Sequence, residues 1–211
     1  MPTVTRISEQ KRRANRRNID LDGSFAFGCN VNVVAKFRLR EGMILSEEQV
    51  QEIQLGEVRQ ECFDGAIRLL ESRLQSTAEM RRKLMRKEFG QMIVDAVIAD
   101  LMRLGYLDDE RFARAKALSA AEHKLHGKRR AKVELLKAGV KSEVADKVLG
   151  DIYESTDTLA TARALAEKQA ARLKKLDPQV ARRRLVGMLQ RRGFDYDDIK
   201  PVVEEILGRG Q

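Results

Sequence analysis

The stretch Gly105-Tyr106-Leu107-Asp108-Asp109-Glu110-Arg111-Phe112-Ala113 decides how this chain folds. Glycine is favoured just past the end of a helix, and acidic residues are favoured in a first helical turn. The stretch therefore predicts that one helix ends at Gly105 and that another begins at Asp108. Similar signals recur along most of the chain, which indicates a mainly α-helical architecture.

From about residue 57 onward the chain has the pattern of consecutive short helices. Asp177 followed by Pro178 is a typical helix start, with a capping side chain and a proline in the first helical position. The remaining start signals are polar or acidic, and the remaining stop signals are glycines. The starts are Ser76…Glu79, Ser142-Glu143 and Asp195…Asp198, and the stops are Gly139 and Gly193.

Apolar residues repeat with a period of just over 50 residues. When Leu84, Leu135 and Leu189 are aligned, the positions five and thirteen residues further on are also apolar. Those positions are Phe89, Val140 and Phe194, and then Val97, Val148 and Val202. One such unit buries little surface, so stacking of neighbouring units is expected. We predict three tandem three-helix repeats in an elongated, curved array, at residues 59–107, 108–155 and 156–211.

Residues 1–58 are expected to form a small separate module that contains a β-hairpin. Asp22-Gly23 is a strong two-residue turn signal between the β-prone segments 16–20 and 24–28. Residues 31–40 have the pattern of a short helix closed by Gly42. Ser46 to Gln49 form a capping box that predicts the start of another helix.

The chain is strongly basic, with a net charge of +9 and a pI of about 9.7. Such a surface favours polyanions or acidic protein partners, and the segment Lys11–Arg17 adds to it. The sequence contains no run of about 20 apolar residues, and its basic start lacks an apolar core, so neither a membrane span nor a secretory signal is expected. Cys29 and Cys62 lie far apart without CxxC spacing, which favours buried thiols in the cytoplasm over a disulfide.

The middle helix of each repeat carries the clearest functional signal. Its apolar residues recur at i and i+4, in the pairs Met80/Leu84, Ala131/Leu135 and Leu185/Leu189. At about 100° per residue, the shared basic positions lie nearly opposite these pairs, so each helix should bury one face and present cations on the other. The candidate binding residues are Arg81, Arg82, Arg86, Lys87, Lys128, Arg129, Arg130, Lys132, Lys137, Arg182, Arg183, Arg184, Arg191 and Arg192.

Rows of cations on stacked repeats suit a phosphate backbone or an acidic protein face. They do not suit sequence readout, because no obvious set of Asn, Gln and Arg side chains is placed to read bases. A merely solvated basic face is the alternative for any one helix.

Other chemistry-bearing residues have structural explanations. His123 and His126 could hold a metal, but no third ligand is suggested, and a solvated pair is the simpler interpretation. The clusters Asp108-Asp109-Glu110 and Asp195-Asp197-Asp198 begin helices, where capping explains them. Tyr106 and Phe112 are expected in the core. No phosphate-binding or nucleophile motif is present, so we expect neither an enzyme nor a cofactor.

The stretch from Gly105 to Ala113 resembles the signature of the RecX family of RecA regulators nearly residue for residue. Ala66–Leu70, Glu134–Val140 and the segment Ile19–Gly28 are similar to further parts of that family. The chain departs from the family pattern at Glu71–Ser76, which lacks a frequent proline. It also lacks a common tryptophan near Lys116, and Lys128-Arg129-Arg130 stands where Gly-Pro-Arg is frequent.

The resemblance implies a protein of homologous recombination, DNA repair and the SOS response. The sequence leaves the oligomeric state open, and we expect a monomer in the cytoplasm. RecX proteins are tandem three-helix repeats that bind the RecA recombinase filament and modulate, usually inhibit, its recombinase, ATPase and co-protease activities. Single- or double-stranded DNA would be contacted through the filament or weakly alone. The alternative from the residues is a helix-turn-helix-like DNA-binding regulator that acts without RecA.

Overall fold

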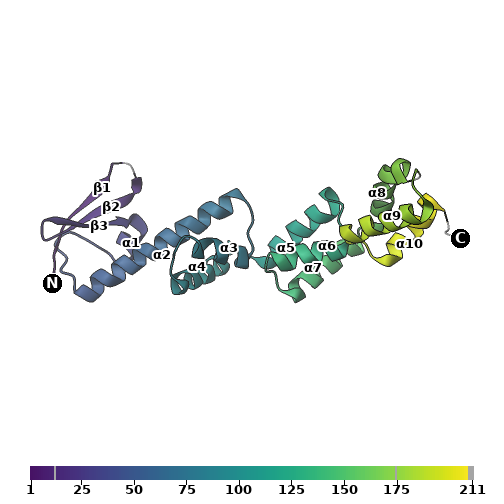
Figure 1. Ribbon diagram of the computed structural model, residues 1–211. Coiled ribbons are helices and arrows are strands. Elements are labelled where there is room, and N and C mark those ends of the chain that lie inside the picture. The colour runs from purple at the N-terminus through teal and green to yellow at the C-terminus, as the bar shows by residue number, and fades with distance from the viewer. Residues whose placement is uncertain (12, 174, 209–211) are drawn as a thin grey trace. The chain divides into compact units, whose positions relative to one another are not determined.

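The computed structural model describes residues 1–11, 13–173 and 175–208, so Arg12 of the basic segment Lys11–Arg17 lies outside the described residues, as do the last three residues of the predicted third repeat. The structure is mainly helical, with one small sheet near the N-terminus (Figure 1). It divides into two compact units. The first comprises Met1–Arg73 and Met80–Tyr106, and the second comprises Leu74–Glu79 and Leu107–Gln211.

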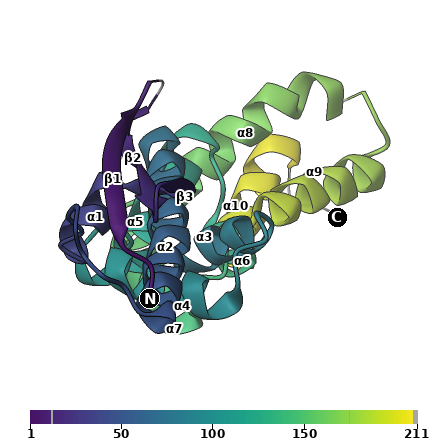
Figure 2. The same cartoon turned by 90° about the vertical axis from the view of Figure 1, so that its left-hand side faces the viewer.

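The N-terminal sheet is antiparallel, in the order β1-β2-β3 (Figures 1 and 2). Its strands are Val4–Gln10 (β1), Arg13–Leu21 (β2) and Ser24–Asn30 (β3). The predicted hairpin at Asp22-Gly23 is confirmed, and both of these residues have positive φ, as a tight hairpin turn requires. Strand β1 was not predicted, because its two apolar residues, Val4 and Ile7, are three positions apart and do not alternate with polar residues as in a regular strand.

Two helices follow the sheet and cover its inner face. The first, α1, runs over Val31–Lys36 and is shorter than the predicted 31–40, because Arg38 adopts a left-handed conformation that a helix cannot continue. The second, α2, spans Glu47–Ser72, and its predicted capping box between Ser46 and Gln49 is confirmed. The helix passes without a break through residue 58. The core between sheet and helices is Val4, Ile19, Cys29, Val33, Leu39, Leu45 and Ile53.

Thr77–Met85 (α3) and Gln91–Arg103 (α4) complete the first three-helix repeat. Met80 and Leu84 on α3 and Val97 on α4 are fully buried, as the repeat alignment predicted. At the end of α4, the Tyr106 amide donates to the Leu101 carbonyl and the Gly105 amide to that of Met102. Gly105 has a φ of 74°, so the predicted stop is a Schellman motif.

Tyr106 was expected in the core, but it is 50% exposed, so that prediction was wrong. The Schellman turn directs the chain so that Leu107, only 2% exposed, takes the buried position next to it. Phe112, five residues further on, is buried as predicted.

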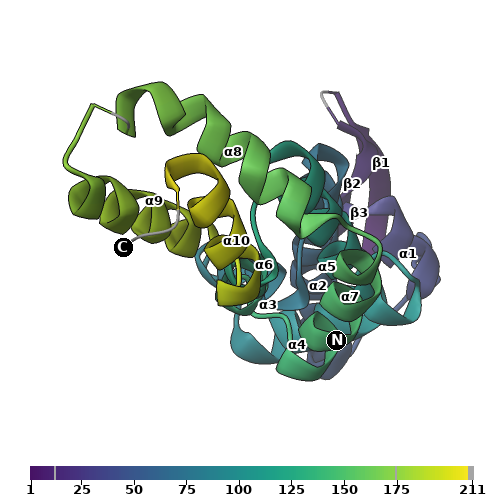
Figure 3. The same cartoon turned by 90° about the vertical axis from the view of Figure 1, so that its right-hand side faces the viewer.

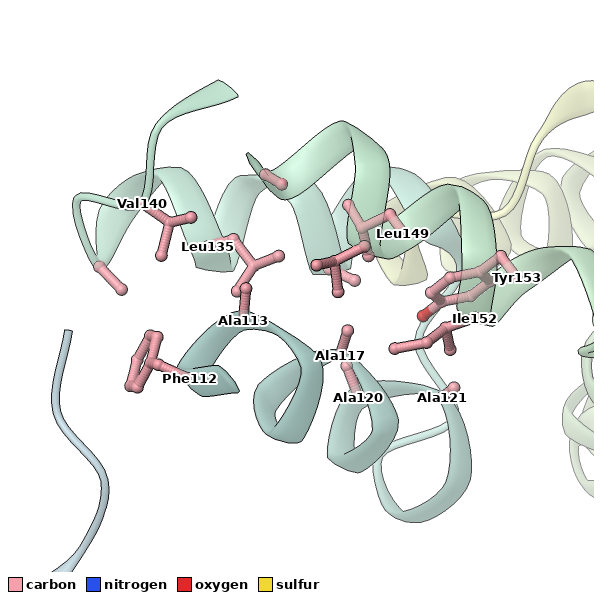
Figure 4. Close-up of a cluster of buried hydrophobic side chains, with 14 residues drawn as sticks. Phe112, Ala113, Ala117, Ala120, Ala121, Leu135, Val140, Leu149, Ile152 and Tyr153 are labelled. Carbon is pink, nitrogen blue, oxygen red and sulfur yellow. The ribbon is translucent and has the colours of Figure 1, made fainter. Parts of the chain in front are cut away.

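The second repeat consists of α5 (Asp109–Leu118), α6 (Lys128–Lys137) and α7 (Ser142–Glu154). One π-helical turn, Ser119–His123, extends α5. Figure 4 shows why alanines dominate the inner side of this helix: Ala113, Ala117 and Ala120 bring its backbone close to Leu135 and Leu149. Leu118 on the same helix is 40% exposed, because it lies about 100° around the helix from Ala117.

The third repeat consists of α8 (Thr158–Leu173), α9 (Pro178–Arg192) and α10 (Tyr196–Leu207). Helix α10 packs against both α8 and α9, which have fewer contacts with each other (Figure 3). Asp177 caps α9 as predicted, because its Oδ1 accepts hydrogen bonds from the Gln179 and Val180 amides. Gly139 and Gly193, with φ of 84° and 87°, end α6 and α9 in the way that Gly105 ends α4. Three three-helix repeats are therefore present, as the sequence predicted.

Candidate functional site

The middle helices α3, α6 and α9 each bury the predicted apolar pair. All six residues of these pairs are at most 2% exposed: Met80, Leu84, Ala131, Leu135, Leu185 and Leu189. The basic positions shared by the three repeats, Arg86, Lys137 and Arg191, are exposed. The periodicity therefore predicted correctly which residues of these helices are buried, and it places cations on the opposite side.

In the first repeat, the predicted binding residues have different surroundings. Arg81 forms an ion pair with Asp95 of α4. Arg82 is exposed on α3, whereas Arg86 and Lys87 lie beyond the last helical residue, in a hydrogen-bonded turn. None of these last three forms an ion pair with another described residue, so their charges face solvent.

In the second repeat, three cations are already paired with acids of the same chain. Arg129 pairs with Asp195, and Lys132 Nζ lies 2.6 Å from Asp146 Oδ1. Arg130 Nε lies 3.6 Å from Glu134 Oε1. Lys128 and Lys137 are exposed, and neither has an ion pair within the described part of the chain.

Glu134 is shared by several positive groups. Its Oε2 accepts a hydrogen bond from Lys124 Nζ at 3.0 Å, and its Oε1 lies 3.2 Å from His126 Nδ1. Burial raises the pKa of Glu134, but the bond from Lys124 and the neighbouring charges outweigh burial and hold the pKa below its usual value. Burial lowers the pKa of His126, against the opposing effect of Glu134. The single carboxylate of Glu134 pairs with both Lys124 and Arg130, so the group of these three side chains keeps a net positive charge.

In the third repeat, the predicted cations are largely unpaired. Arg182, Arg183, Arg184 and Arg191 have no ion pair with any residue that the structure describes. Arg192 is different, because its Nη1 donates to the Lys124 carbonyl at 2.8 Å, and Lys124 belongs to the second repeat.

Within the second unit, the end of α9 meets the beginning of α6. The Gly127 amide donates to the Arg192 carbonyl at 2.9 Å, and the Arg129 amide donates to the Gly193 carbonyl at 3.2 Å. A Cβ on Gly127 would lie 2.2 Å from Gly193 O, so only glycine permits this approach. The free amides at the start of one helix thereby satisfy the free carbonyls at the end of another. This junction brings Lys128, Arg129 and Arg130 next to Arg191 and Arg192.

A related contact occurs at the corresponding positions of the segment Leu74–Glu79, which belongs to the same unit. Ser76, the counterpart of Gly127 in the repeat alignment, donates its hydroxyl to the Ala138 carbonyl at 2.6 Å. Ala138 is the counterpart of Arg192. Equivalent positions of neighbouring repeats are therefore joined by a hydrogen bond in both cases, from Ser76 to Ala138 and from Gly127 to Arg192.

One cation near these rows was not predicted. Arg172, on α8, lies with Arg183, Arg184 and Arg191 of α9 around a groove of about 610 Å³. The repeat alignment could not select Arg172, because it considered only the middle helix of each repeat. A basic residue near the end of the helix preceding α9 is the one signal that the sequence contains.

Two residues of the N-terminal basic segment, Arg16 and Arg17, stabilise the fold of their own module. Arg16 Nη1 lies 2.8 Å from Glu57 Oε1 on α2, and the other oxygen of Glu57 accepts from the Asn30 amide at 2.6 Å. Arg17 pairs with Glu9 across the sheet at 3.0 Å. These two arginines are therefore not available as an open basic face.

The acidic clusters and the cysteines that the sequence drew attention to contribute to helix capping, an ion pair and the core. Asp108 caps α5 by accepting from the Glu110 and Arg111 amides, as expected. Asp195 begins α10, but its side chain pairs with Arg129 rather than capping the helix. Within residues 1–11, 13–173 and 175–208, no three His, Cys, Asp or Glu side chains are grouped as metal ligands, and no helix is long and apolar enough to cross a membrane. Cys29 and Cys62 are free and buried, as predicted.

Four family models match consecutive parts of the chain. Residues 2–46 match the regulatory protein RecX N-terminal domain. Residues 62–101, 108–149 and 155–203 match the first, second and third RecX three-helix domains.

Individual relatives give the same result over nearly the full length. The chain is 32% identical to regulatory protein RecX of Bacillus velezensis over 207 residues, which are 97% of this chain and 78% of that protein. It is also 32% identical to regulatory protein RecX of Bacillus subtilis, over 98% of this chain and 78% of that protein. A crystal structure titled regulatory protein RecX has the same fold, with a TM-score of 0.84 and 21% identity over 96% of this chain and 98% of that chain. The chain therefore belongs to the RecX family of regulatory proteins.

Proposed function

We propose that this protein binds RecA and its DNA filament in the cytoplasm and inhibits the recombinase, ATPase and co-protease activities of RecA. It acts by binding alone, without a catalytic step or a cofactor. RecA is the expected partner because the chain belongs to the RecX family. The middle helices α3, α6 and α9 supply the contact surface.

The observation that carries the proposal is a set of unpaired cations at equivalent positions of the repeats. Arg86, Lys137 and Arg191 are exposed and form no ion pair with a described residue, and Arg184 on α9 shares this state. Unpaired cations attract phosphates and carboxylates at long range and release counterions when they bind, so they accelerate the encounter with an acidic filament.

A helix-turn-helix-like regulator that reads DNA directly is the alternative, and two features of the second unit weigh against it. Recognition helices insert their first residues into the major groove. The first residues of α6 are occupied by the end of α9. The first turn of α10 contains Asp197 and Asp198, which phosphates would repel. Binding that prefers one duplex sequence over random duplex by more than about tenfold, without RecA, would favour this alternative.

The test is inhibition of the RecA ATPase on single-stranded DNA. We expect Arg130→Glu, Lys137→Glu, Arg184→Glu and Arg191→Glu together to abolish inhibition. The matched control reverses four exposed cations outside the middle helices, Arg40, Lys168, Lys175 and Lys200. Each set removes eight units of charge and lowers the net charge from +9 to +1.

Circular dichroism at equal concentration establishes that both variants keep their helices. If the middle-helix variant inhibits as well as the unmodified protein, this surface is not the contact. If the control variant fails equally, net charge rather than position determines inhibition, and the assignment of these residues falls.

A further inference from the structure

The third repeat contains a groove between α8 and α9 whose surroundings differ from the rest of the basic surface. It has a volume of about 610 Å³. Arg172 of α8 and Arg183, Arg184 and Arg191 of α9 line it, and Leu173, Leu185 and Met188 are among its apolar lining residues. The groove therefore combines four positive charges with an aliphatic surface.

The four arginines form no ion pair with a described residue, although acids are present in the same repeat. Arg163, nearer the start of α8, pairs with Glu205 of α10 at 2.9 Å. In contrast, Arg172, Arg183, Arg184 and Arg191 have no ion pair with any residue that the structure describes. Guanidinium groups gathered around one groove repel each other, and a bound anion relieves this repulsion. Each can donate two parallel hydrogen bonds to one carboxylate.

The apolar lining determines what kind of anion fits. Leu173 and Leu185 are buried, whereas Leu176 and Met188, which also line the groove, are only partly buried against the core of the repeat. Methionine adapts its shape to an incoming apolar group. A ligand that carried only charge would leave this lining in contact with water, whereas one large aliphatic side chain would cover it.

We infer that this groove binds an acidic peptide segment with a large apolar side chain among its carboxylates. The inference rests on the proposed function, in that the protein partner would supply this segment. The carboxylates pair with the arginines, and the apolar side chain contacts Leu176 and Met188. Such a segment would pair with the arginines and also cover the apolar lining of the groove.

Nucleic acid fits the groove less well. Proteins that bind single strands stack the bases on aromatic side chains. Among the described residues that line this groove, none is aromatic. Phosphates could pair with the arginines, but the carbon atoms of a sugar–phosphate backbone lie next to ring, ester and phosphate oxygens, so it has no large aliphatic side chain to place against the leucines and the methionine.

The test uses the full chain and a short fluorescein-labelled peptide of aspartate and glutamate with one central leucine, measured by fluorescence anisotropy. We expect saturable binding that weakens as salt is raised. Replacing the central leucine by serine should weaken binding about tenfold, because the apolar contact is lost. Arg184→Glu should weaken it about tenfold or more, whereas Lys200→Glu, an exposed reversal outside the groove, should leave it unchanged.

Arg184→Lys separates the contribution of the two parallel guanidinium hydrogen bonds from that of the positive charge. Lysine keeps the charge but loses the paired hydrogen bonds, so its effect should lie between those of the unmodified protein and Arg184→Glu. Circular dichroism checks that each variant remains folded. Equal affinity for the leucine and serine peptides, or no binding at all, would overturn the inference. So would an oligothymidylate that displaces the peptide at lower concentration than unlabelled peptide does.

These outcomes are separate from those of the proposed function. If the peptide does not bind while the protein still suppresses the RecA ATPase, the groove assignment fails and the proposed function stands. If the peptide binds and the ATPase is unaffected, the groove assignment stands and RecA is not the partner.

Discussion

Gly127→Ala should separate the second and third repeats where α6 and α9 meet. The backbone of Gly127 is extended, with φ of −71° and ψ of 164°, so alanine adopts it without strain. The added Cβ would lie 2.2 Å from Gly193 O and 2.5 Å from the Phe194 nitrogen. The perturbation is therefore a steric conflict between two backbone segments, neither of which can rotate away as a side chain could.

The size of the effect follows from what the conflict disrupts. The Gly127 amide bond to the Arg192 carbonyl and the Arg129 amide bond to the Gly193 carbonyl, at 2.9 Å and 3.2 Å, cannot survive a movement of about 1 Å. Two lost hydrogen bonds, at about 0.5–1.5 kcal/mol each, and overpacking, at about 1–3 kcal/mol, give roughly 2–6 kcal/mol.

Gly90→Ala is the matched control. Gly90 also precedes a helix, also has an extended backbone and has open space where its Cβ would be placed. It should change the free energy of unfolding by less than about 1 kcal/mol. Urea unfolding compares the two variants, and hydrogen exchange should show that the Gly127 and Arg129 amides lose protection only in Gly127→Ala. Equal stability of the two variants, with both amides still protected, would refute the reasoning.

Three further results are expected. Glu88→Gly should stabilise the protein by about 1 kcal/mol in thermal unfolding, because Glu88 has a φ of 64° where Gly139 and Gly193 stand in the other repeats; an unchanged or lower midpoint would contradict this. Burial raises the pKa of Cys29 to about 12 and of Cys62 to about 11, so iodoacetamide at pH 8 should label neither thiol until urea is added; rapid labelling of the folded chain would show that they are accessible. Burial lowers the pKa of His126, so as the pH falls through its ordinary value of 6.5 the unfolded chain binds the proton first and stability declines. His126→Gln should therefore lose less stability on acidification than the unmodified protein, and an identical pH profile would exclude His126 as the cause.

The features that the sequence predicted depend on neighbouring residues. Helix ends at Gly105, Gly139 and Gly193 follow from the left-handed conformation that glycine adopts without strain. The buried pairs of the middle helices follow from helical periodicity, and the turn at Asp22-Gly23 follows from its two residues alone. Each of these requires no knowledge of distant parts of the chain.

The features that the sequence did not predict depend on residues far apart. Strand β1 exists because it pairs with β2, and its own residues alternate poorly. The ion pair of Arg129 with Asp195 joins two repeats, so it could not be inferred from the charge pattern of α6. The approach of Gly127 to Gly193 is equally non-local.

The end of α3 shows a different kind of failure. Gly139 and Gly193 predicted the ends of α6 and α9, but the corresponding residue of the first repeat is Glu88. It adopts the same left-handed conformation without the residue that usually indicates it. Glutamate rarely adopts this conformation, so local propensity gave no signal.

The decisive measurement is the rate of ATP hydrolysis by RecA on single-stranded DNA as this protein is added in increasing amounts. Binding along or at the end of a filament affects many RecA subunits, so the rate should fall when far less than one molecule per RecA is present. A rate that stays constant when this protein is in excess over RecA would contradict the proposal that its exposed cations engage the filament.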